Sequence, residues 1–262
     1  TLLIFVIIFL PLFWLSILSF LDRSKSVSLE NYNRLFGDLY IEAFIVTFQI
    51  SGAVTLICVL LGYPLAYWLS RKPQATANLL LICVLLPFWT AVLVRTYAWL
   101  VLLQRNGLIN NTLITLGIID LPLQLAHNLT ASIIGMVHVM LPFLVLPLYA
   151  AMKNIDTDLV KAAIGLGSSP TEAFWRIFFP MSLPGLFAGV VLVFILSLGF
   201  YVTPALLGGG RVQMIAQRIE STITMYSNWG AASALGVVLL ILAFILVALI
   251  HRVFGLDHLF VT

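Results

Sequence analysis

The chain has 262 residues, of which 62% are hydrophobic and only 9% are charged, whereas a soluble domain carries about 25% charged residues. This composition excludes an ordinary soluble domain and indicates a protein with several membrane spans. The net charge of +3 is small and spread along the chain, so nothing in it favours nucleic-acid binding.

Six apolar stretches are each long enough for a helix that crosses about 30 Å of hydrocarbon, which takes about 20 residues. They cover residues 2–21, 41–70, 79–103, 129–152, 173–200 and 231–251. Apolar and polar side chains do not alternate with a period of two in these stretches, which argues against membrane-spanning strands. We therefore predict an all-α polytopic membrane protein with six transmembrane helices and short interfacial helices. The chain begins at Thr1, directly before the first stretch, so we expect the native amino terminus to lie upstream.

The connections between these stretches differ in kind. Residues 1–40 should hold the first span and an outer interfacial helix with Ser28 as its N-cap, and residues 104–128 should form a longer loop. Residues 201–230 contain three consecutive glycines and then an amphipathic helix with Ile215, Ile219 and Ile223 on one side. Six lysines and arginines fall on either side of the membrane if 71–78 and 153–172 are cytoplasmic. Those two loops are shorter in total than the loops on the other side, so their positive charge is denser, which favours this topology.

Spans two and five carry stripes of small residues that should let neighbouring helices approach closely. In span two the stripe is Ser51, Thr55, Cys58, Gly62 and Ala66, and in span five it is Ser182, Gly185 and Gly189. We interpret both as packing seams, with lining of a transport path as the alternative for span five. Cys58 and Cys83 lie in apolar runs and are interpreted as reduced packing residues.

The loop 153–172 has the pattern of a docking element. Leu159, Ala162, Ala163 and Leu166 fall at i, i+3, i+4 and i+7 on one helical face, and Gly167 should end that helix. Ser169, Pro170 and Glu172 then fit the N-cap, N1 and N3 positions of a new helix. An ordinary helix–turn–helix of a polytopic protein would show the same spacing.

Residues 159–180 resemble the cytoplasmic EAA loop of type I importer permeases of the ABC class. The positions in register are Ala162, Ala163, Gly167, Ile177, Phe179 and Pro180, and Lys161 stands where that family has glutamate. The resemblance implies that Leu159, Lys161, Ala162, Ala163, Leu166 and Gly167 form a coupling helix that docks on an ATPase subunit. It also implies that 41–252 is the permease core, including the coupling loop 153–172, and that 253–262 is a cytoplasmic tail.

Residues 86–99 and 197–209 are similar to signatures of the PotB/PotH permeases for spermidine and putrescine. This resemblance implies an importer in the bacterial inner membrane, surrounded by lipid, with a periplasmic substrate-binding protein, a second and different permease and two ATPase subunits. ATP and Mg would be bound by those ATPases, since the chain has no G-x-x-x-x-G-K-[ST] motif. Opine, amino-phosphonate or amino-acid-like solutes remain alternative substrates. An ion-coupled secondary transporter is a further alternative, but paired acidic residues are absent from the spans.

A transport path for a cation could use aromatic faces and hydroxyl groups. On one helical wheel Trp89, Thr90, Thr96 and Tyr97 share an arc, and we take this face, with Tyr201 and Glu220, as the candidate path; helix packing is the alternative. Arg95 lies in the same span. An arginine inside a span is a candidate functional residue. We favour the alternative that it makes a cation–π contact with Trp99 and reaches toward the outer interface. The four histidines lack ligand spacing, so we predict no metal site, and hydrolase motifs are missing, so we predict no enzyme.

Overall fold

The structure is a computed structural model that describes residues 2–21 and 26–254. The elements are α1 (Leu2–Ser19), α2 (Glu30–Arg34), α3 (Asp38–Ser70), α4 (Gln74–Leu85), η1 (Leu86–Trp89), α5 (Val92–Leu103), α6 (Leu108–Thr115), α7 (Leu129–Lys153), α8 (Thr157–Gly165), α9 (Pro170–Ala173), η2 (Phe174–Phe178), α10 (Phe179–Leu198), α11 (Val202–Leu207), α12 (Ile215–Thr224) and α13 (Trp229–Phe254). Extended pairing in these ranges is limited to one antiparallel bridge between Leu21 and Val27. The all-α prediction is confirmed.

Four helices in the described ranges are long and apolar enough to cross a membrane: Asp38–Ser70, Leu129–Lys153, Pro170–Leu198 and Trp229–Ile250. A bent pair, Gln74–Trp89 with Val92–Thr115, makes five if it counts as one span. The predicted number of six is therefore not confirmed, with α1 present as a further apolar helix. The tail expected at 253–262 lies almost wholly outside the described residues.

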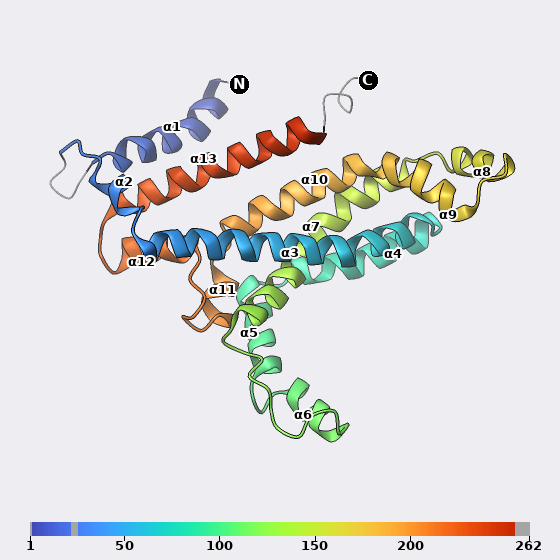
Figure 1. Cartoon of the computed structure of the whole chain (residues 1–262), viewed down its shortest axis with the longest axis horizontal. Helices are drawn as coiled ribbons and strands as arrows, with labels where there is room; N and C mark the ends of the chain where they lie inside the picture. Colours follow the sequence, from blue (N-terminus) through green and yellow to red (C-terminus); the bar gives the residue numbers. More distant parts are fainter. Residues whose placement is uncertain (1, 22–25, 255–262) are drawn as a thin grey trace.

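The core is formed by α3, α7 and α10, which pack along one another (Figure 1). The small residues predicted as seams are buried in this packing. A Cβ on Gly62 would come within 2.6 Å of Leu144, and one on Gly185 within 2.3 Å of the Cβ of Ala151. Both stripes are thus confirmed as the places where α7 meets its two neighbours. Cys58 is buried as predicted, whereas Cys83 is exposed, so the packing interpretation was wrong for Cys83.

The third predicted span is not one helix. Gln74–Leu85 continues into the 3-10 turn Leu86–Trp89, and the chain is extended at Thr90 before α5 begins. The two halves meet at 92°, and α5 and α6 project from the bundle as an arm (Figure 1). Pro87 lies in this turn, and Thr90 satisfies the carbonyl oxygen of Pro87 through its own hydroxyl at 2.8 Å. Residues 79–103 are apolar on both sides of the break, so composition alone did not indicate it.

The loop predicted at 104–128 contains a helix, α6, that was missed. Buried Asn110 organises the return of the chain. Its side-chain amide donates to the carbonyl oxygens of Gln104 and Leu123, at 3.0 and 2.9 Å, and its oxygen accepts from the amide of Leu123. One polar side chain thereby joins α6 to both of its flanking segments, next to the apolar cluster around Leu103 and Ala126.

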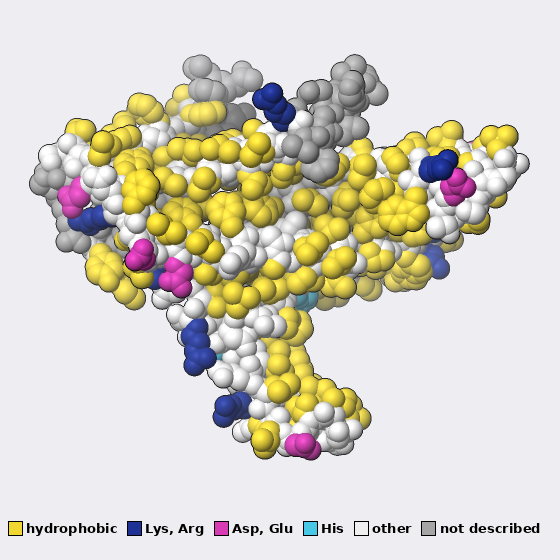
Figure 2. Space-filling view, in the orientation of Figure 1, with side chains coloured by type: hydrophobic (Ala, Val, Ile, Leu, Met, Phe, Trp, Pro, Cys, Tyr) yellow, Lys and Arg dark blue, Asp and Glu magenta, His cyan; other side chains and the backbone are white. Residues whose placement is uncertain are grey.

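The two ends of the bundle differ. The turn after α3 and the loop with α8 and α9 lie at one end, joined by a hydrogen bond from the ammonium of Lys153 to the carbonyl oxygen of Lys72 at 3.1 Å. The helices α2 and α12 lie at the other end (Figure 1). This arrangement agrees with the predicted placement of 71–78 and 153–172 on one side of the membrane. Figure 2 shows hydrophobic side chains over most of the visible bundle, with charged side chains mainly near its ends and on the arm.

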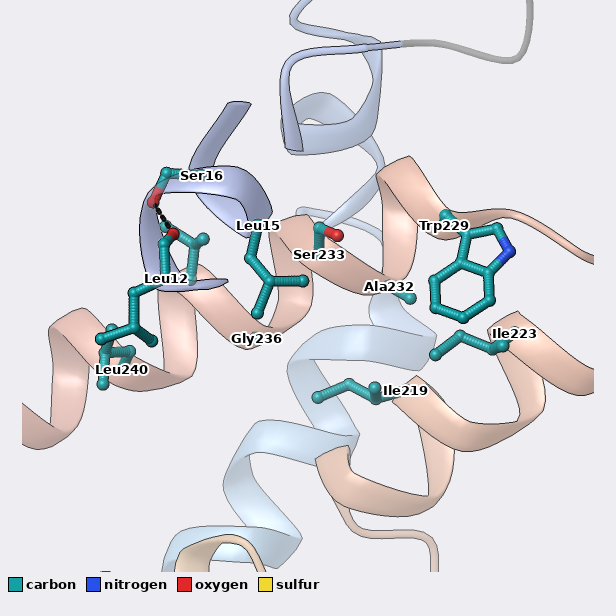
Figure 3. A pocket seen from close by; sticks show the side chains of 11 residues that line it. Leu12, Leu15, Ser16, Ile219, Ile223, Trp229, Ala232, Ser233, Gly236 and Leu240 are labelled. Carbon is teal, nitrogen blue, oxygen red and sulfur yellow. Dashed lines mark hydrogen bonds between the residues drawn. The ribbon is translucent and has the colours of Figure 1, made fainter. Parts of the chain in front are cut away.

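At the end of the bundle that holds α2 and α12, the structure confirms α12 as an amphipathic helix, with Ile215 fully buried. The first interfacial helix begins later than predicted: Leu29 is the N-cap of α2, and Ser28 instead accepts from the amide of Glu30 at 3.1 Å. Between α1, α12 and α13 lies an apolar groove of about 210 Å³. Figure 3 shows Leu15 and Ile219 among its walls and Trp229 beside Ile223.

Candidate functional site

The helix α8 begins with a side-chain cap that the sequence interpretation did not identify. The carboxylate of Asp156 accepts a hydrogen bond from the amide of Asp158 at 2.9 Å, which satisfies an otherwise unpaired donor of the first turn. The carboxylate of Asp158 in turn pairs with the ammonium of Lys161, at 2.7 Å. The Asp-x-Asp spacing before the alanines was the available signal.

The end of α8 is set by glycine geometry. Helix α8 ends at Gly165, two residues earlier than predicted, and Gly167 follows with φ of +99°. The amide of Ser168 donates to the carbonyl oxygen of Ala163, and the amide of Gly167 donates to that of Ile164, both at 3.0 Å. This pair of bonds is the Schellman motif, in which glycine supplies the left-handed conformation.

The exposed face of α8 is narrower than predicted. Val160 is buried and Ala163 is half-buried against the α3–α7 packing. Leu159 is 47% exposed and Leu166 89% exposed, and Ala162 and Lys161 also face outward. Two leucines and an alanine thus form an apolar surface that the described chain leaves uncovered.

The next helix, α9, starts at Pro170 as predicted and is followed by a wider, π-helical turn. The hydroxyl of Ser169 accepts from the amide of Glu172 at 3.2 Å, and Pro170 occupies the first turn. The carboxylate of Glu172 pairs with Arg176 at 3.2 Å. Residues Phe174–Phe178 form a π-turn, closed by a bond from the amide of Phe179 to the carbonyl oxygen of Phe174.

Aromatic contacts fasten this π-turn to α3. The ring of Tyr67 meets the rings of Phe174 and Phe178 edge-on, with centroids 5.3 and 5.0 Å apart. The guanidinium of Arg71 lies over the rings of Tyr67 and Phe178 and donates to the Tyr67 hydroxyl at 2.7 Å. The loop helices are therefore held rigidly against a long helix of the core.

Asp158 and Lys161 of α8 each stabilise the charged form of the other. The hydrogen bond from Lys161 lowers the pKa of Asp158, and the same bond raises the pKa of Lys161. Both side chains are exposed, so their pairing orients the two groups and adds little stability.

A short helix with an uncovered apolar face, attached by aromatic contacts to a bundle of long apolar helices, fits a membrane component that works with a partner. The family of binding-protein-dependent transport system inner membrane components matches residues 58–255. The chain belongs to this family. Its place in the inner membrane and its role as a transport permease follow from that membership.

Among similar permeases, the spermidine/putrescine transport system permease protein PotB of Haemophilus influenzae is 37% identical over 240 residues. The match covers 89% of this chain and 84% of that protein. PotB of Escherichia coli K12 is 35% identical, over 87% of this chain and 86% of that one. The molybdenum transport system permease protein ModB of Mycobacterium bovis is 31% identical, over 78% and 76% of the two chains.

The fold is that of solved ABC importers. A bacterial ABC transporter for the import of alginate superposes with a TM-score of 0.77 at 17% identity, covering 96% of this chain and 91% of that one. An alginate transporter in complex with its periplasmic protein gives a TM-score of 0.76 at 18% identity, covering 95% and 90%.

The residues proposed for a path do not share one helix in this permease. Trp89 ends η1 and Thr90 lies in the break, so the single wheel that grouped them with α5 was wrong. Thr96 is buried, with its hydroxyl 3.0 Å from that of Thr203 in α11, whereas Tyr97 is 53% exposed.

The remaining two path candidates lie toward the end of the bundle that holds α2 and α12 (Figure 1). Tyr201 precedes α11 and is 38% exposed, and α11 packs on α5. Glu220 lies on α12, which packs on α13 and α3. The structure therefore brings Thr96, Tyr97 and Tyr201 into one region and places Glu220 on a separate helix.

The surroundings of Arg95 differ from the interpretation. The indole of Trp99 donates to Nδ1 of His138 at 2.9 Å, with the rings edge-on at 5.9 Å. Cation–π pairs in the described residues involve Arg71 and Lys72, so the predicted contact of Arg95 with Trp99 was wrong. Arg95 is buried, with 7% of its surface exposed.

Proposed function

We propose that the chain is the permease subunit of an ATP-driven importer for polyamines, spermidine and putrescine. The observation that carries the proposal is the 37% identity to a spermidine/putrescine permease over 89% of the chain. A periplasmic binding protein delivers the substrate to the outer end, where α2 and α12 lie, and this chain forms half of the path. A second, different permease forms the other half.

The coupling to ATP is assigned to α8. Two ATPase subunits bind ATP and Mg, and one of them receives the outward face with Leu159, Ala162 and Leu166, together with Lys161, in a surface cleft. The Schellman turn at Gly167 transmits its movement through α9 and the π-turn to α10, and the aromatic contact of Phe174 with Tyr67 transmits it to α3. Differential contact of this kind is what biases a two-state bundle.

The path is assigned to Trp89, Thr90, Thr96, Tyr97, Tyr201 and Glu220. Aromatic faces attract an ammonium group weakly enough for it to leave again. Glu220 would attract the cation at the outer mouth, which requires that its carboxylate exchange its contact with the Thr224 hydroxyl, now at 3.1 Å, for the substrate.

The experiment is uptake by the complete complex, reconstituted with its second permease, ATPases and binding protein. We expect ATP-dependent accumulation of spermidine that persists when ionophores collapse ion gradients, and no accumulation of molybdate. Uptake that follows an ion gradient and ignores ATP would contradict the importer. ATP-dependent uptake of a different solute in place of polyamines would contradict only the substrate.

A further inference from the structure

Arg95 is a buried cation without a counter-charge among the described residues, 2–21 and 26–254. Its side chain and backbone together are 7% exposed, and its Nε and Nη1 atoms have no hydrogen-bond partner. Ion pairs within residues 2–21 and 26–254 join Arg34 to Glu30, Lys161 to Asp158 and Arg176 to Glu172. None of them includes Arg95. A guanidinium left unpaired inside a membrane protein is costly, so a partner for it is expected.

The two positions one turn before and one turn after Arg95 are small and uncovered. Ala91 and Ala98 stand at i−4 and i+3, on the same helical face as Arg95, and both are exposed. Small residues with this spacing allow a second membrane helix to approach closely. On the other side of Arg95, Thr96 and Trp99 are already engaged with α11 and α7. The open approach to the guanidinium is therefore along the two alanines.

The chemistry of the missing partner follows from the charge. A planar guanidinium is best satisfied by a carboxylate, which accepts two parallel hydrogen bonds. A cationic cargo would be repelled by Arg95. A free anion would satisfy the charge but would not require the two small, exposed side chains that flank Arg95.

We infer that a helix of the second permease packs along Ala91 and Ala98 and pairs a carboxylate with Arg95. The inference rests on the proposed function in requiring a second permease. The pair fixes the arm of α5 and α6 to the partner subunit at the break in the bent span, where the two permeases must stay in register while the bundle moves.

The test is co-purification of this chain with an affinity-tagged second permease from the full complex in detergent. Arg95→Met should lower the retained amount by at least about tenfold, as expected for truncating one partner of a buried charge pair, and Arg95→Lys should retain most of it. Ala98→Leu should also lower retention, because a larger side chain blocks close approach. Arg105→Met is the matched control, since Arg105 is exposed on the loop after α5, and should leave retention unchanged.

A charge exchange keeps the test decisive where Arg95→Met fails to accumulate. Arg95→Asp is combined in turn with an arginine at each acidic position of the second permease's spans. Restored assembly with one such change supports the pair, and failure at every position overturns it. Full retention of Arg95→Met also overturns it, as does unchanged assembly with a raised KM for the cargo. Because retention does not depend on which solute is carried, failure of the polyamine assignment would leave this result intact.

Discussion

The hydroxyl of Tyr63 in α3 lies 2.8 Å from the hydroxyl of Ser182 in α10, although 119 residues separate them. The hydroxyl of Ser182 already donates its single hydrogen to the carbonyl oxygen of Phe179 at 2.7 Å. Tyr63 is therefore the donor in their mutual bond. This bond ties the first turn of α10 to α3 just above the π-turn.

Removing this bond should weaken the joint between the loop and the core. We expect Tyr63→Phe to lower the stability of the complex by about 1 kcal/mol, the usual net value of a hydrogen bond, measured as a lower melting temperature in detergent. Tyr149→Phe is the matched control. The hydroxyl of Tyr149 is buried without a partner in the described chain, so its removal should leave stability equal or higher. Equal losses in both variants would show that the bond contributes nothing.

The two glycines at the end of α8 should respond oppositely to alanine. Gly167 has φ of +99°, and both Gly165 and Gly167 have open space where a Cβ would stand. Gly167→Ala should therefore cost about 1–2 kcal/mol for backbone conformation alone, and it should reduce both ATPase retention and uptake. Gly165→Ala lies in the helix and should be neutral or slightly stabilising. Normal assembly and uptake in Gly167→Ala would contradict a role for this turn in docking.

Close contact between α7 and α10 should make Gly185 intolerant of any side chain. Its Cβ would lie 2.3 Å from the Cβ of Ala151 and 2.9 Å from the carbonyl oxygen of Pro147, so the two helices would have to separate. Gly185→Ala should destabilise the protein by about 1–3 kcal/mol. Gly52→Ala is the control, because nothing lies within 4 Å of that Cβ. A melting temperature of Gly185→Ala equal to that of wild type would show that the bundle repacks freely.

The cation of α8 should matter for the choice of ATPase partner. Lys161→Glu places a third acidic side chain within one turn of Asp156 and Asp158. We expect this variant to reduce the amount of ATPase that co-purifies with the permease more than Lys161→Met does. Retention that rises in Lys161→Glu would show that the cleft prefers an acid at this position.

The pH dependence of the same pair follows from its pKa shifts. Asp158 has a lowered pKa, so its stabilising contribution is present above the ordinary carboxyl pKa of about 3.9 and is lost as pH falls through the lowered value. Lys161 has a raised pKa, so its contribution is complete below about 10.4 and is lost as pH rises through the raised value. Between about pH 4 and pH 10 both groups therefore stay charged, and the amount of ATPase that co-purifies should not change with pH on account of this pair. A step near neutral pH that disappears in Lys161→Met would contradict this.

Composition and periodicity were sufficient for the features that depend on burial. The long apolar stretches became α3, α7, α10 and α13, and the small residues at four-residue spacing became buried seams, because lipid requires helices and close packing requires small side chains. The cap at Ser169 was also predicted, since it depends on local chemistry alone.

The remaining features depend on geometry that an apolar stretch conceals. The bend at Thr90 and the π-turn at Phe174 both lie in runs of large hydrophobic residues, which satisfy the pattern of one continuous helix. The exposure of Ala162 and the burial of Val160 depend on how α8 packs against α9, η2 and the apolar cluster that they share with the core helices. That orientation comes from tertiary contact, and no spacing within the loop encodes it.

The π-turn sets the rotation between α9 and α10. A π-turn holds one more residue than an α-helical turn, so the side chains of α10 are displaced by about 100° around the axis relative to a continuous helix from α9. Deleting a single residue among Phe174–Phe178 would allow an unbroken α-helix. It would also turn Gly185 and Gly189 away from α7. Larger side chains of α10 would then face α7, so a more regular helix would pack less well.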